Sequence, residues 1–320
     1  MTLQVRVGVP PGLTDRVVAA AAASDGTSDI ALHRGASLRP AGDVVIIHSA
    51  RESAGELLKA LEDLQVPQVG SITLIEPRLV LSDAAEEAKR RVPGDSADAV
   101  IWDQVTNETG EEAKLSWTFL VFIIIATQLA GIGIVTNSTI AIVGAMVVGP
   151  EFGPLAALSL ALVERRFDLA RRALMTLVVG FTAAMAVTAA AAAASIPLGL
   201  VPRGLLEHGE SAADFIYHPG PYSLIVAVLA GAVGMMSMIG RKSAALVGVF
   251  ISVTTVPAAG FVAVALVLGE QVKALESGIQ LAINLAGIVL SAVAVLLVYR
   301  WIEKGPLLRL RRHPGGRTSA

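Results

Sequence analysis

One charged residue, Glu151, lies inside a long apolar stretch of this sequence. No other charged residue occurs between positions 115 and 163, and Glu151 belongs to the string Gly149-Pro150-Glu151-Phe152-Gly153-Pro154. Proline lacks a backbone N–H and clashes with the preceding turn, so the string predicts a break in a membrane-spanning helix. Such a break persists at membrane depth only inside protein or beside water, and a carboxylate there indicates an ion or proton path. The string therefore predicts a permeation site; the alternative is a packing kink whose glutamate binds backbone amides.

A second interruption occurs later in the chain. The string Thr254-Thr255-Val256-Pro257-Ala258-Ala259-Gly260 divides another apolar segment, and Asn284 lies in the last one. Asn284 and Gln128 are amides in apolar surroundings, which either line a path or form hydrogen bonds between helices. The candidate path consists of the following residues: Gly144, Gly149, Pro150, Glu151, Gly153, Pro154, Thr254, Thr255, Pro257 and Asn284.

The string GAMVVGPEFGP, from Gly144 to Pro154, also carries a resemblance to a known family. It follows an N-terminal soluble segment and precedes Arg-rich residues. In these features the chain resembles, over nearly its whole length, the family catalogued as domain of unknown function 389, a group of bacterial and archaeal hydrophobic membrane proteins. The resemblance implies an architecture rather than an activity.

The composition is that of an integral membrane protein. Of the 320 residues 54% are hydrophobic and 16% are charged, with a mean hydropathy of +0.66, whereas a soluble domain has about 25% charged residues. No cysteine is present, which excludes disulfides and thiolate metal sites. No basic tract with interleaved aromatic residues suggests nucleic-acid binding, and no cofactor motif occurs. The apolar segments contain no His, Asp or Cys, so we expect no enzymatic activity.

Residues 1–77 predict a small cytoplasmic α/β domain. Leu3, Val5, Val7 and Val9 alternate as in a half-buried strand, and further strands are predicted at 29–33, 43–49 and 69–76. Helices are predicted to begin at Thr14 and Ser53. The order βαββαβ is that of a ferredoxin-like domain with an antiparallel sheet. This domain either binds a small ligand or partner that biases the membrane part, or serves as a folded assembly module.

Residues 78–114 predict a helical interfacial linker, and residues 115–303 predict six membrane spans. Each span is near the roughly 20 residues that cross a bilayer. The predicted spans are 115–135, 138–163, 173–196, 221–240, 244–269 and 276–302. Lys and Arg gather after the second, fourth and sixth spans, and residues 304–320 form a basic tail. By the positive-inside rule both termini are cytoplasmic, in the cytoplasmic (inner) membrane. We expect four arginines to anchor the protein to anionic lipid headgroups: Arg165, Arg166, Arg171 and Arg172.

The two halves of the membrane part resemble each other. Leu129-Ala130-Gly131 matches Leu229-Ala230-Gly231, and Ser138, Gly144 and Pro154 find counterparts in Ser243, Gly248 and Pro257. Because three spans per half is an odd number, the second half must enter the membrane in the opposite sense. Paired, interrupted helices in inverted repeats indicate a binding site in secondary transporters.

The sequence as a whole predicts a multi-span α-helical membrane protein with an N-terminal α/β ferredoxin-like domain. We expect a homo-oligomer in the lipid bilayer that transports or conducts a small solute or ion, without nucleic acid as a partner and without a cofactor. The alternative is a membrane-embedded sensor or scaffold without conduction. Residues 202–221 predict a solvated or lid-like external loop, whose two histidines are a weak metal signal.

Overall fold

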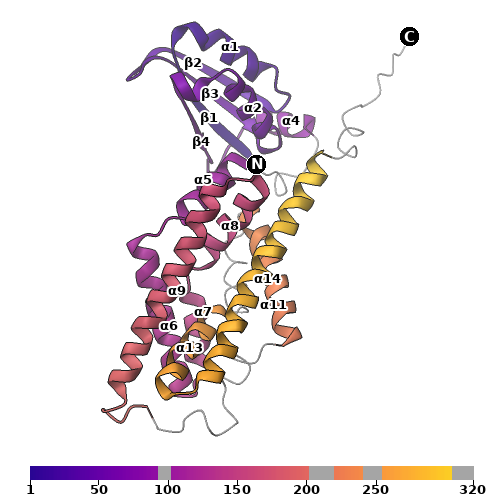
Figure 1. The fold of residues 1–320 in the computed structure, drawn as a ribbon. Helices are drawn as coiled ribbons and strands as arrows, with labels where there is room; N and C mark the ends of the chain where they lie inside the picture. The colour runs from indigo at the N-terminus through magenta and orange to yellow at the C-terminus, as the bar shows by residue number, and fades with distance from the viewer. Residues whose placement is uncertain (93–101, 202–219, 241–253, 305–320) are drawn as a thin grey trace, which may run out of the picture. The chain divides into compact units, whose positions relative to one another are not determined.

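The computed structural model describes residues 1–92, 102–201, 220–240 and 254–304. Residues 202–219 of the predicted external loop, residues 305–320 of the predicted basic tail and residues 244–253 of the predicted fifth span lie outside these residues. The chain divides into two compact units, one extending to Asp103 and the other covering Gln104–Glu303. Each is described by itself (Figure 1).

The first unit is a four-stranded antiparallel sheet with helices. Its sheet order is β2-β3-β1-β4, and every neighbouring pair is antiparallel. Leu3, Val5, Val7 and Val9 lie in its core with the inward residues of the helices. The elements are β1 (Thr2–Val9), α1 (Pro11–Ala22), β2 (Thr27–Leu38), β3 (Ala41–Ala50), α2 (Arg51–Asp63), α3 (Val66–Val69), β4 (Ser71–Ile75) and α4 (Asp83–Arg91). The small N-terminal antiparallel sheet predicted from the sequence is confirmed.

The predicted starts of the first two helices are wrong. α1 begins at Pro11, because proline is well suited to the first helical position. Thr14 lies inside the helix, and its hydroxyl donates a hydrogen bond of 2.7 Å to Oδ2 of Asp43. α2 begins at Arg51, and the hydroxyl of Ser53 donates to the carbonyl of Ala50 at 2.9 Å. Both side chains therefore bind groups other than the backbone N–H groups that a cap would satisfy.

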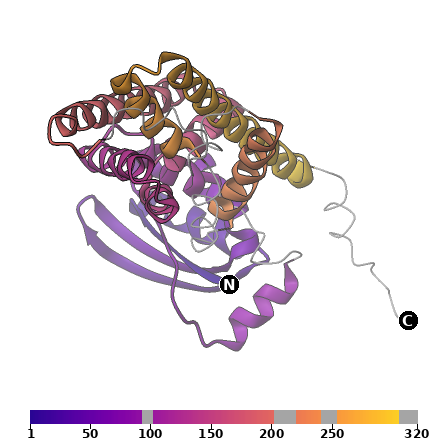
Figure 2. The same ribbon diagram turned by 90° about the horizontal axis from the view of Figure 1, so that it is seen from below.

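The second unit consists of helices that run beside one another as a bundle (Figures 1 and 2). They are α5 (Trp102–Glu112), α6 (Trp117–Val135), α7 (Thr139–Val148), α8 (Phe152–Glu164), α9 (Phe167–Ser195), α11 (Pro221–Ile239), α13 (Thr255–Leu268) and α14 (Gln271–Lys304). Many large apolar side chains on α6, α9, α11 and α14 are exposed, as lipid-facing surfaces require. The unit thus has the composition and surface of a membrane domain.

The described helices support fewer spans than the six predicted. Four of them, α6, α9, α11 and α14, are long and apolar enough to cross a membrane, and α7 with α8 forms a fifth candidate if the bent pair is one span. α13 has only 14 residues. The described residues therefore contain four or five candidate spans, which are consistent with a membrane protein, and they do not confirm the count of six.

Glycines let the short helix α13 approach α6 closely. A Cβ on Gly260 would lie 2.8 Å from the Cβ of Ala130 and 3.2 Å from the carbonyl oxygen of Thr127. All residues from Thr255 to Phe261 are buried. α13 is therefore enclosed by other helices and carries the second interruption into the interior of the unit.

Candidate functional site

The predicted break in the first apolar string is present. α7 ends at Val148, α8 begins at Phe152, and the two helices are bent by 49°. Pro154 lies in the first turn of α8 and Pro257 in the first turn of α13. Backbone N–H groups in a first turn have no partner within the helix, so proline is tolerated there. These two prolines therefore open new helices rather than kink a continuous one.

A hydrogen bond of Glu151 links the break between α7 and α8 to the start of α13. Glu151 is the N-cap residue of α8 and is 6% exposed, and its Oε1 accepts a hydrogen bond of 2.5 Å from the hydroxyl of Thr255. The carboxyl group of Glu151 also lies over Gly149, because a Cβ at that glycine would collide with Oε2. Thr254, the residue before Thr255, is the N-cap residue of α13. The N-terminal ends of two helices far apart in the sequence thus meet at one carboxyl group.

α14 completes the polar network. Nδ2 of Asn284 donates to Oγ1 of Thr254 at 3.0 Å, and Nε2 of Gln280 donates to Oδ1 of Asn284 at 3.1 Å. The hydroxyl of Ser277 donates to the carbonyl of Ala258 on α13 at 3.0 Å. We call the residues Glu151, Thr254, Thr255, Gln280 and Asn284 the junction.

Gln280 and Ser277 are absent from the path predicted from the sequence. Gln280 lies four residues before Asn284 and therefore on the same face of a helix. That spacing is a usable signal, because two amides one turn apart on an apolar helix form a polar stripe. Ser277 lies one turn further toward the start of α14 and continues this stripe.

Two buried oxygen atoms of the junction have no hydrogen-bond partner among the described residues: Oε2 of Glu151 and Oε1 of Gln280. Leaving a buried acceptor without a partner costs about 1–3 kcal/mol, and more when the group is charged. Any group that binds both oxygen atoms would therefore stabilise the folded protein. The described helices α6, α7, α11 and α13 contain no charged residue that could do so.

The other predicted path residues divide into two groups. Gly149, Pro150, Gly153 and Pro154 surround Glu151 in the chain, and a Cβ on Gly153 would lie 3.0 Å from the Cβ of Glu112 on α5. Gly144, by contrast, would place a Cβ in open space. No side chain of the junction would therefore contact a Cβ at Gly144.

The amide of Gln128 also lies elsewhere. Its Nε2 donates to the carbonyl of Val187 on α9 at 3.5 Å, which is a contact between helices.

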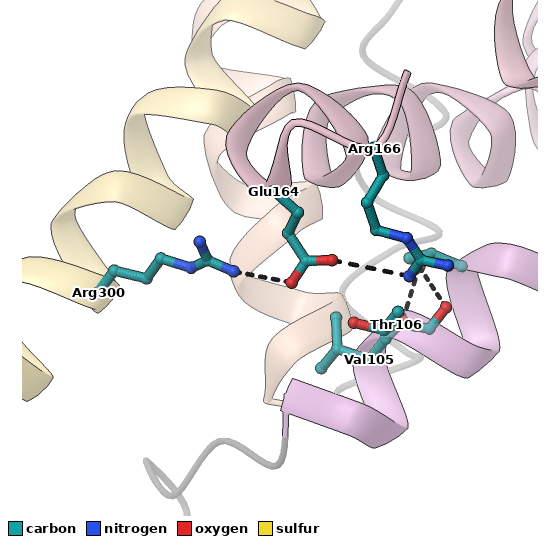
Figure 3. Close-up of polar contacts among 6 residues, drawn as sticks. Val105, Thr106, Glu164, Arg166 and Arg300 are labelled. Carbon is teal, nitrogen blue, oxygen red and sulfur yellow. Dashed lines mark hydrogen bonds and ion pairs between the residues drawn. The ribbon is translucent and has the colours of Figure 1, made fainter. Parts of the chain in front are cut away.

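One of the four arginines after α8, Arg166, lies in a cluster of charges around Glu164. Glu164, at the end of α8, accepts a hydrogen bond of 2.7 Å from Arg300 on α14, and its other oxygen lies 3.7 Å from Arg166 (Figure 3). Val105 and Thr106 of α5 lie beside the guanidinium of Arg166 in the same view. All four arginines, Arg165, Arg166, Arg171 and Arg172, are exposed. The ion pairs of Glu164 tie the end of α8 to α14 and to the start of α9.

Comparisons with known proteins agree with the resemblance seen in the sequence. The chain is 24% identical over 238 residues to an uncharacterised protein of Methanocaldococcus jannaschii, covering 73% of this chain and 70% of that protein. No solved structure matches the chain. The sequence model of the family described as Domain of unknown function (DUF389) matches residues 146–290, which include the junction. Over residues 146–290 the chain is therefore similar to the DUF389 family, in agreement with the resemblance predicted from its sequence.

Proposed function

We propose that this protein is a transporter or channel for a small solute or ion, and that the permeating species contacts the junction. The hydrogen bond between Glu151 and Thr255 carries the proposal, because it joins two interrupted apolar segments 104 residues apart. Discontinuous helices whose N-terminal ends meet are the construction that transporters use to bind solutes and ions inside a membrane. A purely structural kink in α7–α8 would not require a polar partner from α13.

Similarities between the two halves of the membrane part support this proposal. α8 and α13 each carry proline at the third helical position and end at a residue with left-handed backbone, Arg165 with φ of 57° and Gly269 with φ of 83°. A long helix begins two residues later in both cases. α6 and α11 have 19 residues each.

Corresponding glycines also make corresponding contacts. A Cβ on Gly131 would meet the side chain of Thr188 on α9, and a Cβ on Gly231 would meet Ser291 on α14. Thr188 and Ser291 lie at nearly the same distance along these two long helices. We infer an inverted 3+3 repeat of six spans, in which the fifth span includes α13.

The remaining parts of the proposal concern assembly and orientation. The strand order and the two long helices of the first unit suit a ferredoxin-like domain, which we place in the cytoplasm together with both chain termini. We propose a homo-oligomer in the cytoplasmic membrane whose exposed arginines contact lipid headgroups, and no enzymatic activity. The alternative is a sensor or scaffold without conduction, which is favoured by the nearly complete burial of Gln280 and Asn284, 0% and 1% exposed.

Flux measurements in proteoliposomes distinguish the two functions. The full-length protein is reconstituted, and a panel of inorganic ions and small metabolites is applied while solute entry and membrane current are recorded. We expect flux of at least one species, with a strong loss in Thr255→Val, which removes the hydroxyl that binds Glu151. Thr136→Val is the matched control, because its hydroxyl donates only to Ile132 in its own helix. Absence of flux for the entire panel with correctly folded protein favours the sensor.

A further inference from the structure

The unpartnered atoms of the junction share one chemical property. Oε2 of Glu151 and Oε1 of Gln280 are both acceptors, and both belong to side chains at least nine-tenths buried. Glu151 is hydrogen-bonded to Thr255, and Gln280 is linked through Asn284 to Thr254, the chain neighbour of Thr255. An acceptor oxygen interacts favourably with a hydrogen-bond donor or a cation, so the missing partner must be electropositive.

The charges near the junction do not supply this partner. Glu112 contacts Gly153 from α5 and is itself acidic. On α14, Arg300 binds Glu164, and Lys273 lies 3.8 Å from Glu270. The remaining titratable residues on the described helices packed around the junction lie toward helix ends: Asp168, Arg171, Arg172, Tyr222, Glu276 and Tyr299. The described basic residues are thus exposed or bound to other acids.

The donor set of the junction selects the kind of ion. It consists of one carboxyl group, two amide oxygens and two hydroxyls, and oxygen ligands of this kind suit hard cations. A divalent ion would leave an excess positive charge beside a single carboxylate. An anionic solute is disfavoured as well, because the carboxyl group of Glu151 already occupies the place where the N-terminal ends of α8 and α13 meet.

We propose that the junction binds a small monovalent cation of the Na⁺ type, with Oε2 of Glu151 and Oε1 of Gln280 as ligands. The inference rests on the proposed function, because it names the ion for the same site.

Binding is tested with Na⁺ alone on the full-length protein in detergent. The melting temperature is recorded while NaCl replaces choline chloride at constant ionic strength. We expect a saturable rise in melting temperature. No response to Na⁺ between pH 6 and pH 9 would overturn the proposal.

Three variants assign the effect to the junction. Glu151→Gln should abolish the Na⁺-dependent rise in melting temperature, and Gln280→Leu should weaken Na⁺ binding by about tenfold or more. Glu87→Gln on α4 is the matched control, since it removes one exposed carboxylate by the same change outside the helices of the junction, and it should respond as the wild type does. An unchanged Na⁺ response in Glu151→Gln would exclude the site. If Glu151→Gln does not fold, Gln280→Leu decides the question alone.

The binding assay separates this inference from the proposed function. Na⁺ binding that depends on Glu151, combined with no flux of any species, would support the proposed cation site and contradict the proposed transport function. Flux that depends on Thr255 but not on Na⁺ would support the proposed transport function and contradict the proposed cation site.

Discussion

At the scale of single residues, Asp43 and Glu151 are both buried carboxyl groups with different numbers of partners. Asp43 is 3% exposed, and its two oxygens accept hydrogen bonds from the backbone N–H of Gly35 at 2.8 Å and from the hydroxyl of Thr14 at 2.7 Å. Glu151 has such a partner on only one oxygen among the described residues. Full satisfaction is typical of a structural group, whereas an incomplete set of partners at an internal junction is typical of a binding site.

The pH dependence of stability should reveal the structural role of Asp43. The N–H of Gly35, followed by the hydroxyl of Thr14, lowers the pKa of Asp43 below its ordinary value. Its stabilisation is therefore fully present above the unfolded-state pKa of about 3.9 and is lost as the pH falls through the lower folded-state value. We expect Asp43→Asn to destabilise the protein at neutral pH, with a difference from wild type that shrinks in acid.

Urea unfolding of the full-length protein in detergent, followed by circular dichroism at several pH values, measures this difference. Asp15→Asn is the control, because the side chain of Asp15 is 91% exposed. A difference between wild type and Asp43→Asn that grows in acid would contradict the assignment.

At the scale of elements, prolines set where α8 and α13 begin and glycines set how closely α13 approaches α6. At Gly260 the backbones themselves come close, because a Cβ there would lie 3.1 Å from the backbone nitrogen of Gly131. Small residues are the usual means by which membrane helices pack without a hydrophobic driving force. The position of Thr254 and Thr255 at the junction therefore depends on this packing.

We expect Gly260→Ala to destabilise the protein by about 1–3 kcal/mol, the usual cost of overpacking a core. Its Cβ would lie 2.8 Å from the Cβ of Ala130, so α13 must move away from α6. Gly144→Ala is the matched control, since its Cβ enters open space and alanine is favoured over glycine in a helix by about 0.5–1 kcal/mol. Thermal unfolding in detergent checks both, and equal melting temperatures for the two variants would show that the α6–α13 contact is loose.

The sequence predicts elements well where the signal is local and poorly where it is not. Gly149 to Pro154 predict the break because proline acts on its own turn. α9 begins at Phe167 and α14 at Gln271, earlier than the predicted positions 173 and 276, because charged residues such as Arg171 and Lys273 continue these helices beyond the apolar segments. The contact between Thr255 and Glu151 joins distant segments, and no local pattern in the sequence specifies it.

At the scale of the whole molecule, the proposed topology places the two ends of α9 on opposite sides of the membrane. α9 has 29 residues and is long and apolar enough to span. Its first turn follows the arginine-rich turn after α8, which the positive-inside rule assigns to the cytoplasm. This assignment determines the orientation of every other helix in the proposed repeat.

Single cysteines in this cysteine-free chain test the orientation. We expect an impermeant maleimide to label Leu198→Cys in intact cells and to leave Asp168→Cys unlabelled until the cells are opened. Both residues are exposed near the ends of α9, so access to the reagent differs only by the side of the membrane. The reverse pattern of labelling would invert the proposed topology.

The most direct test of the central claim, that permeation involves Glu151, is the pH profile of flux in proteoliposomes for wild type and Glu151→Gln. Glutamine keeps the shape of the side chain and removes its titration. We predict that Glu151→Gln retains the wild-type melting temperature, while the pH dependence of its flux becomes flat. A variant that folds normally and keeps the wild-type pH profile would contradict the claim and assign Glu151 to the structural closure of the break between α7 and α8.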